Sequence, residues 1–142
     1  MDLDLTLPLF CKFLNSRFLW FPPFFFDRCI YRTTEISLYI HQDHQRRGLG
    51  ALMLREMMRI AKDMNFRNII AGITAENEGS VILFSKFGFK NVGHFHDVGY
   101  KFGRYLDVVF LEYITDAQVP EGQTIPSFKS FDWKNYVFGG QN

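Results

Sequence analysis

Apolar and polar residues alternate between residues 33 and 41 of the chain. A period of two is typical of a β-strand with one buried face, so this pattern predicts a strand over Thr33–His41. From Leu49 to Met64 the apolar residues instead recur at steps of three and four. That period predicts an amphipathic helix, and Asn65 is suited to the left-handed conformation that often ends one.

The next segments repeat the succession of strand and helix. An apolar run over Asn68–Ile73 predicts a short buried strand. A polar loop then leads to a predicted helix over Ser80–Phe87, which Gly88 should end. Alternating strands and helices favour parallel strands joined by a right-handed crossover, so the pattern predicts an α/β sheet.

Two later runs, Asn91–Asp97 and Tyr105–Tyr113, predict antiparallel strands joined by a turn at Gly99–Gly103. The residues before the first strand are rich in Phe and Pro, and those after the last are interrupted by Pro and Gly. A chain of 142 residues suffices for one core. The expected division is a divergent segment over residues 1–30, one domain over 31–115 and a tail over 116–142.

Composition narrows the class of partner. The 16 basic and 15 acidic residues nearly cancel, so we expect no nucleic acid or anionic lipid as a partner. The aromatic run between Arg17 and Asp27 is shorter than the ~20 residues of a spanning helix, and two prolines interrupt it, so we expect no membrane insertion. Two cysteines are too few for a disulfide framework, which favours a reducing, cytoplasmic setting.

Two histidine pairs have spacings that suit metal ligands. His41 and His44 form one pair, and His94 with His96 forms the other, where residues two apart on a strand share a face. No Cys or carboxylate cluster lies beside either pair in the sequence, so we expect no metal site. The methionines of the first helix are expected to fill the core.

The segment Gln45–Gly50 lies between a predicted strand and the start of the long predicted helix. Backbone N–H groups at a helix start have no partner within the helix, and glycine lets a phosphate approach closely, so a pyrophosphate would fit there. The segment matches neither the dinucleotide-binding glycine pattern nor a Walker loop. An ordinary glycine-bearing turn remains the alternative.

Several motifs together resemble the GNAT superfamily of N-acetyltransferases, in particular its phosphinothricin acetyltransferase branch. The string QRRGLG looks like the Q/R-x-x-G-x-G/A signature of that superfamily, at the expected junction of strand and helix. The resemblance extends over Tyr31–Tyr113, and its other parts are Tyr31–Ile40, Asn77 with Ser80, Phe84–Phe89, Gly99–Gly103 and Asp107–Val108. It implies an α/β (α+β) fold with a mixed sheet and flanking helices, in which the family's N-terminal strands and helices are largely missing.

The resemblance also implies acetyl-CoA as co-substrate and assigns roles to individual residues. Asn77 would hydrogen-bond the pantetheine region, with a helix-capping asparagine as the alternative. The pantetheine arm would lie along a strand, whose residues may instead make ordinary sheet pairs, and the pyrophosphate would lie in the turn. The strand residues are Leu38, Tyr39 and Ile40; the turn residues are Arg46, Arg47, Gly48, Leu49, Gly50 and Ala51.

Glu35 matches the glutamate that the family uses as general base, which would take a proton from the attacking ammonium. A solvent-facing glutamate on a strand is the alternative. Two positions depart from the family: Phe84 stands where many members place a tyrosine, and Phe102 stands where this branch often shows a histidine. No hydroxyl is therefore available at residue 84 to protonate the leaving thiolate.

The implied function is transfer of an acetyl group from acetyl-CoA to the primary amine of a small amino-acid-like acceptor, such as one resembling methionine sulfoximine or phosphinothricin. A non-catalytic CoA-binding or regulatory remnant of such an enzyme is the alternative. If the sheet begins with the strand that holds Glu35, that edge strand is open to pairing, so we expect either a homodimer or poor solubility.

Overall fold

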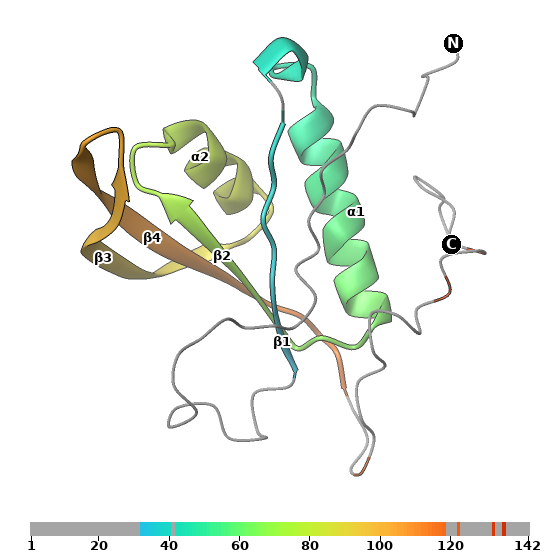
Figure 1. Cartoon of the computed structure of the whole chain (residues 1–142). Helices are drawn as coiled ribbons and strands as arrows, with labels where there is room; N and C mark the ends of the chain where they lie inside the picture. The colour runs from blue at the N-terminus through green and yellow to red at the C-terminus, as the bar shows by residue number, and fades with distance from the viewer. Residues whose placement is uncertain (1–31, 41, 119–121, 123–131, 133–134, 136–142) are drawn as a thin grey trace.

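In the part of the chain that the structure describes, four strands form one mixed sheet, with two α-helices on one of its faces (Figure 1). The computed structural model describes residues 32–40, 42–118, 122, 132 and 135. The strands lie in the order β1-β2-β4-β3. In chain order the elements are β1 (Thr33–Glu35), the short 3-10 helix η2 (Gln42–His44), α1 (Leu49–Asp63), β2 (Asn68–Thr74), α2 (Glu78–Lys86), β3 (Lys90–Lys101) and β4 (Arg104–Ile114).

The strand directions confirm the predicted fold class. β1 and β2 are parallel, with Thr33 opposite Asn68, and α1 forms the connection between them. β4 is antiparallel to β2 and to β3, so β3 and β4 form the predicted hairpin. The result is a mixed sheet with flanking helices, in which β1 is an edge strand of the described residues.

The core lies between the helices and the sheet. Leu54 and Ala61 of α1 are fully buried, and the apolar stripe of the helix packs on buried side chains of β2 and β4. The methionines of this region are also buried, which confirms their expected role as core residues: Met53, Met57, Met58 and Met64. Phe84 joins α2 to the same core, so both helices are fixed on one face of the sheet.

The first strand is shorter than predicted. Its pairing ends just after Glu35, where the Ile36 N–H donates to the Ile70 carbonyl at 2.8 Å. The prediction is wrong beyond this point because residues 36–40 leave the sheet, although Ile36 itself remains buried in the core. Alternation of side chains fixes which face is buried but does not fix whether a neighbouring strand stays within bonding distance. His41 lies outside the described residues.

The hairpin turn is tighter than predicted. The strands run on to Lys101 and resume at Arg104, so the turn consists of Phe102 and Gly103, both with positive φ. Two residues with positive φ suit the twist of a two-residue hairpin. The irregularity falls instead within β3, where the register shifts between Phe95 and Gly99.

The helix ends agree closely with the sequence pattern. α1 begins at Leu49, and Asn65, just beyond its end, has φ 59°, the expected left-handed conformation. α2 begins two residues before the predicted start, and Gly88 follows it with φ 91°. Within the described part of the chain, neither helix has the length and apolar character needed to cross a bilayer. Most of residues 1–30 and 116–142 fall outside the description, so the proposed division of the chain stays a prediction.

Candidate functional site

A cleft of about 120 Å³ opens where residues 36–39 diverge from β2. Pairing between the two segments stops at the bond from Ile36 to Ile70, and the strands separate from there toward the start of α2. One wall of the cleft comes from residues 36–39 and the other from the end of β2 and the first turns of α2. Its lining residues are Ile36, Ser37, Leu38, Tyr39, Gly72, Ile73, Thr74, Asn77, Ser80 and Phe84.

Three of the residues assigned to the pantetheine region line this cleft. Leu38 and Tyr39 belong to one wall and Asn77 to the other, so residues almost forty positions apart meet across the opening. Ile40 does not line it. Its side chain lies against the start of α1, and its carbonyl accepts a bond of 3.1 Å from the Gln45 side chain.

The predicted phosphate turn has an unusual backbone. Arg46 has φ 59° and Gly48 has φ 78°, so two of three successive residues are left-handed immediately before α1. Gly48 is the N-cap of α1, and no side chain caps this end. The first N–H groups of a helix have no partner within it, so those of Leu49, Gly50 and Ala51 are the donors that an anion would meet.

Gly50 joins this turn to the cleft by close packing. A β-carbon at residue 50 would lie 3.1 Å from Leu83, 3.4 Å from Ile40 and 3.9 Å from Leu38. The first turn of α1 therefore rests directly on α2 and on the segment that forms one cleft wall. Gly48, by contrast, has open space around the position of a β-carbon.

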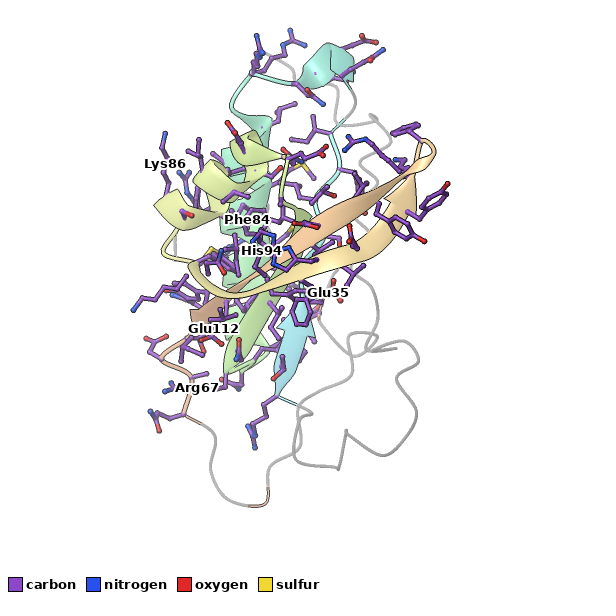
Figure 2. The ribbon with its side chains drawn as sticks, turned by 90° about the vertical axis from the view of Figure 1, so that its left-hand side faces the viewer. Glu35, Arg67, Phe84, Lys86, His94 and Glu112 are labelled. Carbon is purple, nitrogen blue, oxygen red and sulfur yellow. The ribbon has the colours of Figure 1, made fainter. Side chains whose placement is uncertain are left out.

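Glu35, which Figure 2 labels at the end of β1, is not one of the residues that line the cleft. Ile36 enters the core, so the preceding Glu35 points to the opposite face of the sheet. Its Oε1 is 3.9 Å from the position of a β-carbon at Gly72, which does line the cleft. Partial burial raises the pKa of the Glu35 carboxyl above its usual value.

The sequence singled out Asn77, just before α2, and Phe84 within it, and both have defined structural roles. Asn77 is the N-cap of α2, and its Oδ1 accepts the Ser80 N–H at 3.1 Å, so the capping role is real. This bond uses the oxygen and leaves the amide group of Asn77 as a separate donor. Phe84 packs edge-to-face on Phe89 at 5.0 Å while also lining the cleft.

The structure brings together one set of polar residues that the sequence left apart. His94 Nε2 and His96 Nδ1 each lie 2.9 Å from Oδ2 of Asp107, which is on the facing strand β4. The premise that no carboxylate accompanies this pair is therefore wrong. The antiparallel pairing of the predicted hairpin was the available signal, but the register shift in β3 hid which residues meet.

Known proteins match this chain in both sequence and structure. The family described as "Acetyltransferase (GNAT) domain" matches residues 26–110. The L-amino acid N-acyltransferase of Escherichia coli is 38% identical over 86 residues, covering 61% of this chain and 50% of that protein. The phosphinothricin N-acetyltransferase of Streptomyces coelicolor is 35% identical over 80 residues, covering 56% of this chain and 47% of the relative. The chain thus spans about half the length of these relatives.

Solved structures that resemble this chain are also acetyltransferases. A GNAT superfamily phosphinothricin acetyltransferase from Sinorhizobium meliloti, solved in complex with AcCoA, matches with a TM-score of 0.62 at 27% identity, over 68% of this chain and 54% of that one. An N-acetyltransferase from Staphylococcus aureus matches with a TM-score of 0.58 at 37% identity, over 58% of this chain and 50% of that one. The family profile covers more than half of the residues, and the chain belongs to the GNAT acetyltransferase domain family.

Proposed function

We propose that this chain binds acetyl-CoA and transfers its acetyl group to the primary amine of a small amino-acid-like acceptor. The observation that carries the proposal is the cleft between diverging strands, which adjoins an uncapped helix start through Gly50. The names of the relatives support it, because they act on L-amino acids and phosphinothricin.

The residues present fit the cofactor's two polar regions. The N–H groups at the start of α1 suit a pyrophosphate, and Arg46 and Arg47 in the same turn add positive charge nearby. Leu38 and Tyr39 lie beyond the paired part of β1 and line the cleft, where strand-like N–H and C=O groups would suit the amides of a pantetheine arm. The amide group of Asn77 supplies a donor from the opposite wall.

Glu35 accepts the proton that the acceptor ammonium must lose before it can attack. Acetyl-CoA supplies the activated acetyl thioester. A general base works best when its pKa lies near the working pH, and burial moves the Glu35 pKa in that direction. The carboxylate is near the cleft wall at Gly72 but outside the lining, so we expect an intervening water to relay the proton.

No acid group is needed at Phe84. The leaving group is a thiolate whose conjugate acid has a pKa of about 8.5, so it departs without a proton more readily than an alkoxide. The buried ring of Phe84 instead forms an apolar end to the cleft. We propose that its role is to exclude water from the thioester.

The test combines binding with turnover. Acetyl-CoA binding is measured by calorimetry, and thiol release is then followed across a panel of amino acids. Binding and release together support the transferase. Glu35→Gln should keep binding but lower kcat about 10²-fold or more, the usual contribution of a positioned base.

Glu112→Gln is the matched control. Glu112 and Glu35 lie on either side of Ile70 in the same cross-strand row, but Glu112 accepts a bond from Asn68, away from the cleft lining. Equal loss of activity in both variants, or none in Glu35→Gln, would show that Glu35 is not the base.

A second candidate is a CoA-binding protein that does not turn over. The specific observation in its favour is Phe84, which removes the hydroxyl that many family members place on this helix. Acetyl-CoA binding with no thiol release for any amino acid would support this alternative. Absence of binding by a folded chain would contradict both candidates.

A further inference from the structure

The hairpin carries a group of three side chains that no step of acetyl transfer uses. His94 and His96 belong to β3, and their rings are stacked with centroids 4.5 Å apart and planes inclined by 26°. Asp107 reaches both from β4, and one ligand atom from each of the three residues lies within 4.8 Å of the other two. Figure 2 shows His94 on this hairpin, on a different element from Glu35.

We propose that His94 Nε2, His96 Nδ1 and Asp107 Oδ2 bind one divalent transition-metal ion of the Zn²⁺ type. Each nitrogen is 2.9 Å from the carboxylate oxygen. Ligands held ~2.0–2.1 Å from a common ion are separated by roughly 3.0–3.4 Å, so the two nitrogen–oxygen separations need little change. The two nitrogens, which lie within 4.8 Å of each other, would turn toward the ion. The ion would replace the two hydrogen bonds that now join the imidazoles to Asp107.

The backbone of the hairpin holds the carboxylate in place. The irregular stretch of β3 puts Asp97 at φ 55°, and its N–H donates to the other oxygen of Asp107, Oδ1, at 2.9 Å. A bond to the second oxygen is the usual way in which proteins orient a carboxylate ligand. The register shift thus places both imidazoles at Oδ2 of Asp107 and the Asp97 N–H at Oδ1.

The charge state of Asp107 also suits a cation. Its Oδ1 accepts the Asp97 N–H and its Oδ2 contacts both imidazoles, each at 2.9 Å, and this arrangement suits a negatively charged carboxylate. A ligand set of two imidazole nitrogens and one carboxylate favours a transition metal, since Mg²⁺ and Ca²⁺ prefer oxygen ligands.

The site is open to solvent, which leaves room for water as the remaining ligands. The exposed fractions of the His94, His96 and Asp107 side chains are 44%, 75% and 33%. The Asp107 carbonyl also accepts the Ala75 N–H at 2.9 Å, directly beyond β2. A bound ion would therefore stabilise the position of the hairpin relative to β2, which forms part of one cleft wall. We expect it to stabilise the fold rather than take part in acetyl transfer.

Zn²⁺ binding by the full chain tests the proposal, measured by competition with a chromogenic chelator. We expect one ion per chain and at least a tenfold weaker affinity in His96→Gln. His96 is mostly exposed, so this variant should fold normally. His44→Gln is the matched control, because His44 is an exposed histidine on η2, next to Arg47, and its variant should bind as the wild type does.

A second measurement identifies the ligand atoms in the unaltered chain. In imidazole ¹⁵N spectra, Zn²⁺ should shift His94 Nε2 and His96 Nδ1 and leave His44 unchanged. Thermal unfolding should move to higher temperature with Zn²⁺ in the wild type and not in His96→Gln. Failure of the wild type to bind one ion, or binding that His96→Gln retains in full, would overturn the proposal.

Discussion

Ile36 should couple the stability of the fold to the shape of the cleft. It has an exposed fraction of 2%, it donates the last described backbone bond between β1 and β2, and it lines the cleft. Ile36→Val removes one methylene from this position. Burial of one methylene is worth about 0.8 kcal/mol, and the small cavity left behind brings the expected cost to about 1 kcal/mol.

Ile69→Val is the matched comparison. Ile69 is fully buried on β2 in the same core cluster, but it does not line the cleft. Both variants should therefore lower the free energy of unfolding by about 1 kcal/mol, which shifts the Tm by roughly 4–8 °C in a domain of this size. Differential scanning fluorimetry measures this shift without ligand.

Acetyl-CoA titration separates the two variants. If the lost methylene faces bound ligand, Ile36→Val should weaken binding by about fourfold, the equivalent of about 0.8 kcal/mol. Ile69→Val should leave the affinity unchanged within twofold or so. Equal affinity losses would refute the claim that the end of β1 shapes the binding cleft, and an unchanged Tm for Ile36→Val would refute its tight packing.

Three further predictions concern single residues. Burial raises the pKa of Glu35, and the base works only when ionised, so activity should fall with decreasing pH already above the ordinary glutamate pKa of 4.5. The pH profile of kcat/KM measures this, and a fall that occurs only at or below pH 4.5 would contradict it. Asn77→Ala should lose the helix cap and about 1 kcal/mol of stability. Asn77→Asp keeps the capping oxygen, so its Tm should be unchanged, but it lacks the amide donor and should bind acetyl-CoA more weakly. Equal affinity of Asn77→Asp and wild type would show that the Asn77 amide does not bind the cofactor. Gly48→Ala meets no neighbouring atom, so its cost of about 1 kcal/mol should come from the left-handed backbone alone, and an unchanged Tm would disprove that strain.

The parts of the fold set by local pattern were predictable. The three- and four-residue spacing of apolar side chains located α1, and Asn65 marked its end, because helix formation depends on residues close in sequence. The signature of the turn at Gly48 likewise pointed to the right junction. The left-handed Arg46 was not predictable from its residue type, since arginine has no special preference for positive φ.

The parts set by pairing between distant segments were not predictable. Alternation continues past Glu35, yet the strand ends there because the chain turns away from β2, and only the packing of the whole sheet decides this. The meeting of His96 with Asp107 depends on the register shift in β3, which the hydrophobic pattern does not encode.

The strand order also has a consequence for folding during synthesis. β2 lies between β1, which precedes it, and β4, which is the last of the described strands in the sequence, so Asn68 cannot pair with Ile114 until β4 has been made. Until then, a ribosome-bound chain that contains β1, α1 and β2 has an unpaired edge on β2, where β4 will later bind. Pairing between distant segments slows folding, and an unpaired strand edge can bind other chains. We therefore expect nascent chains that stall before β4 to be prone to aggregation.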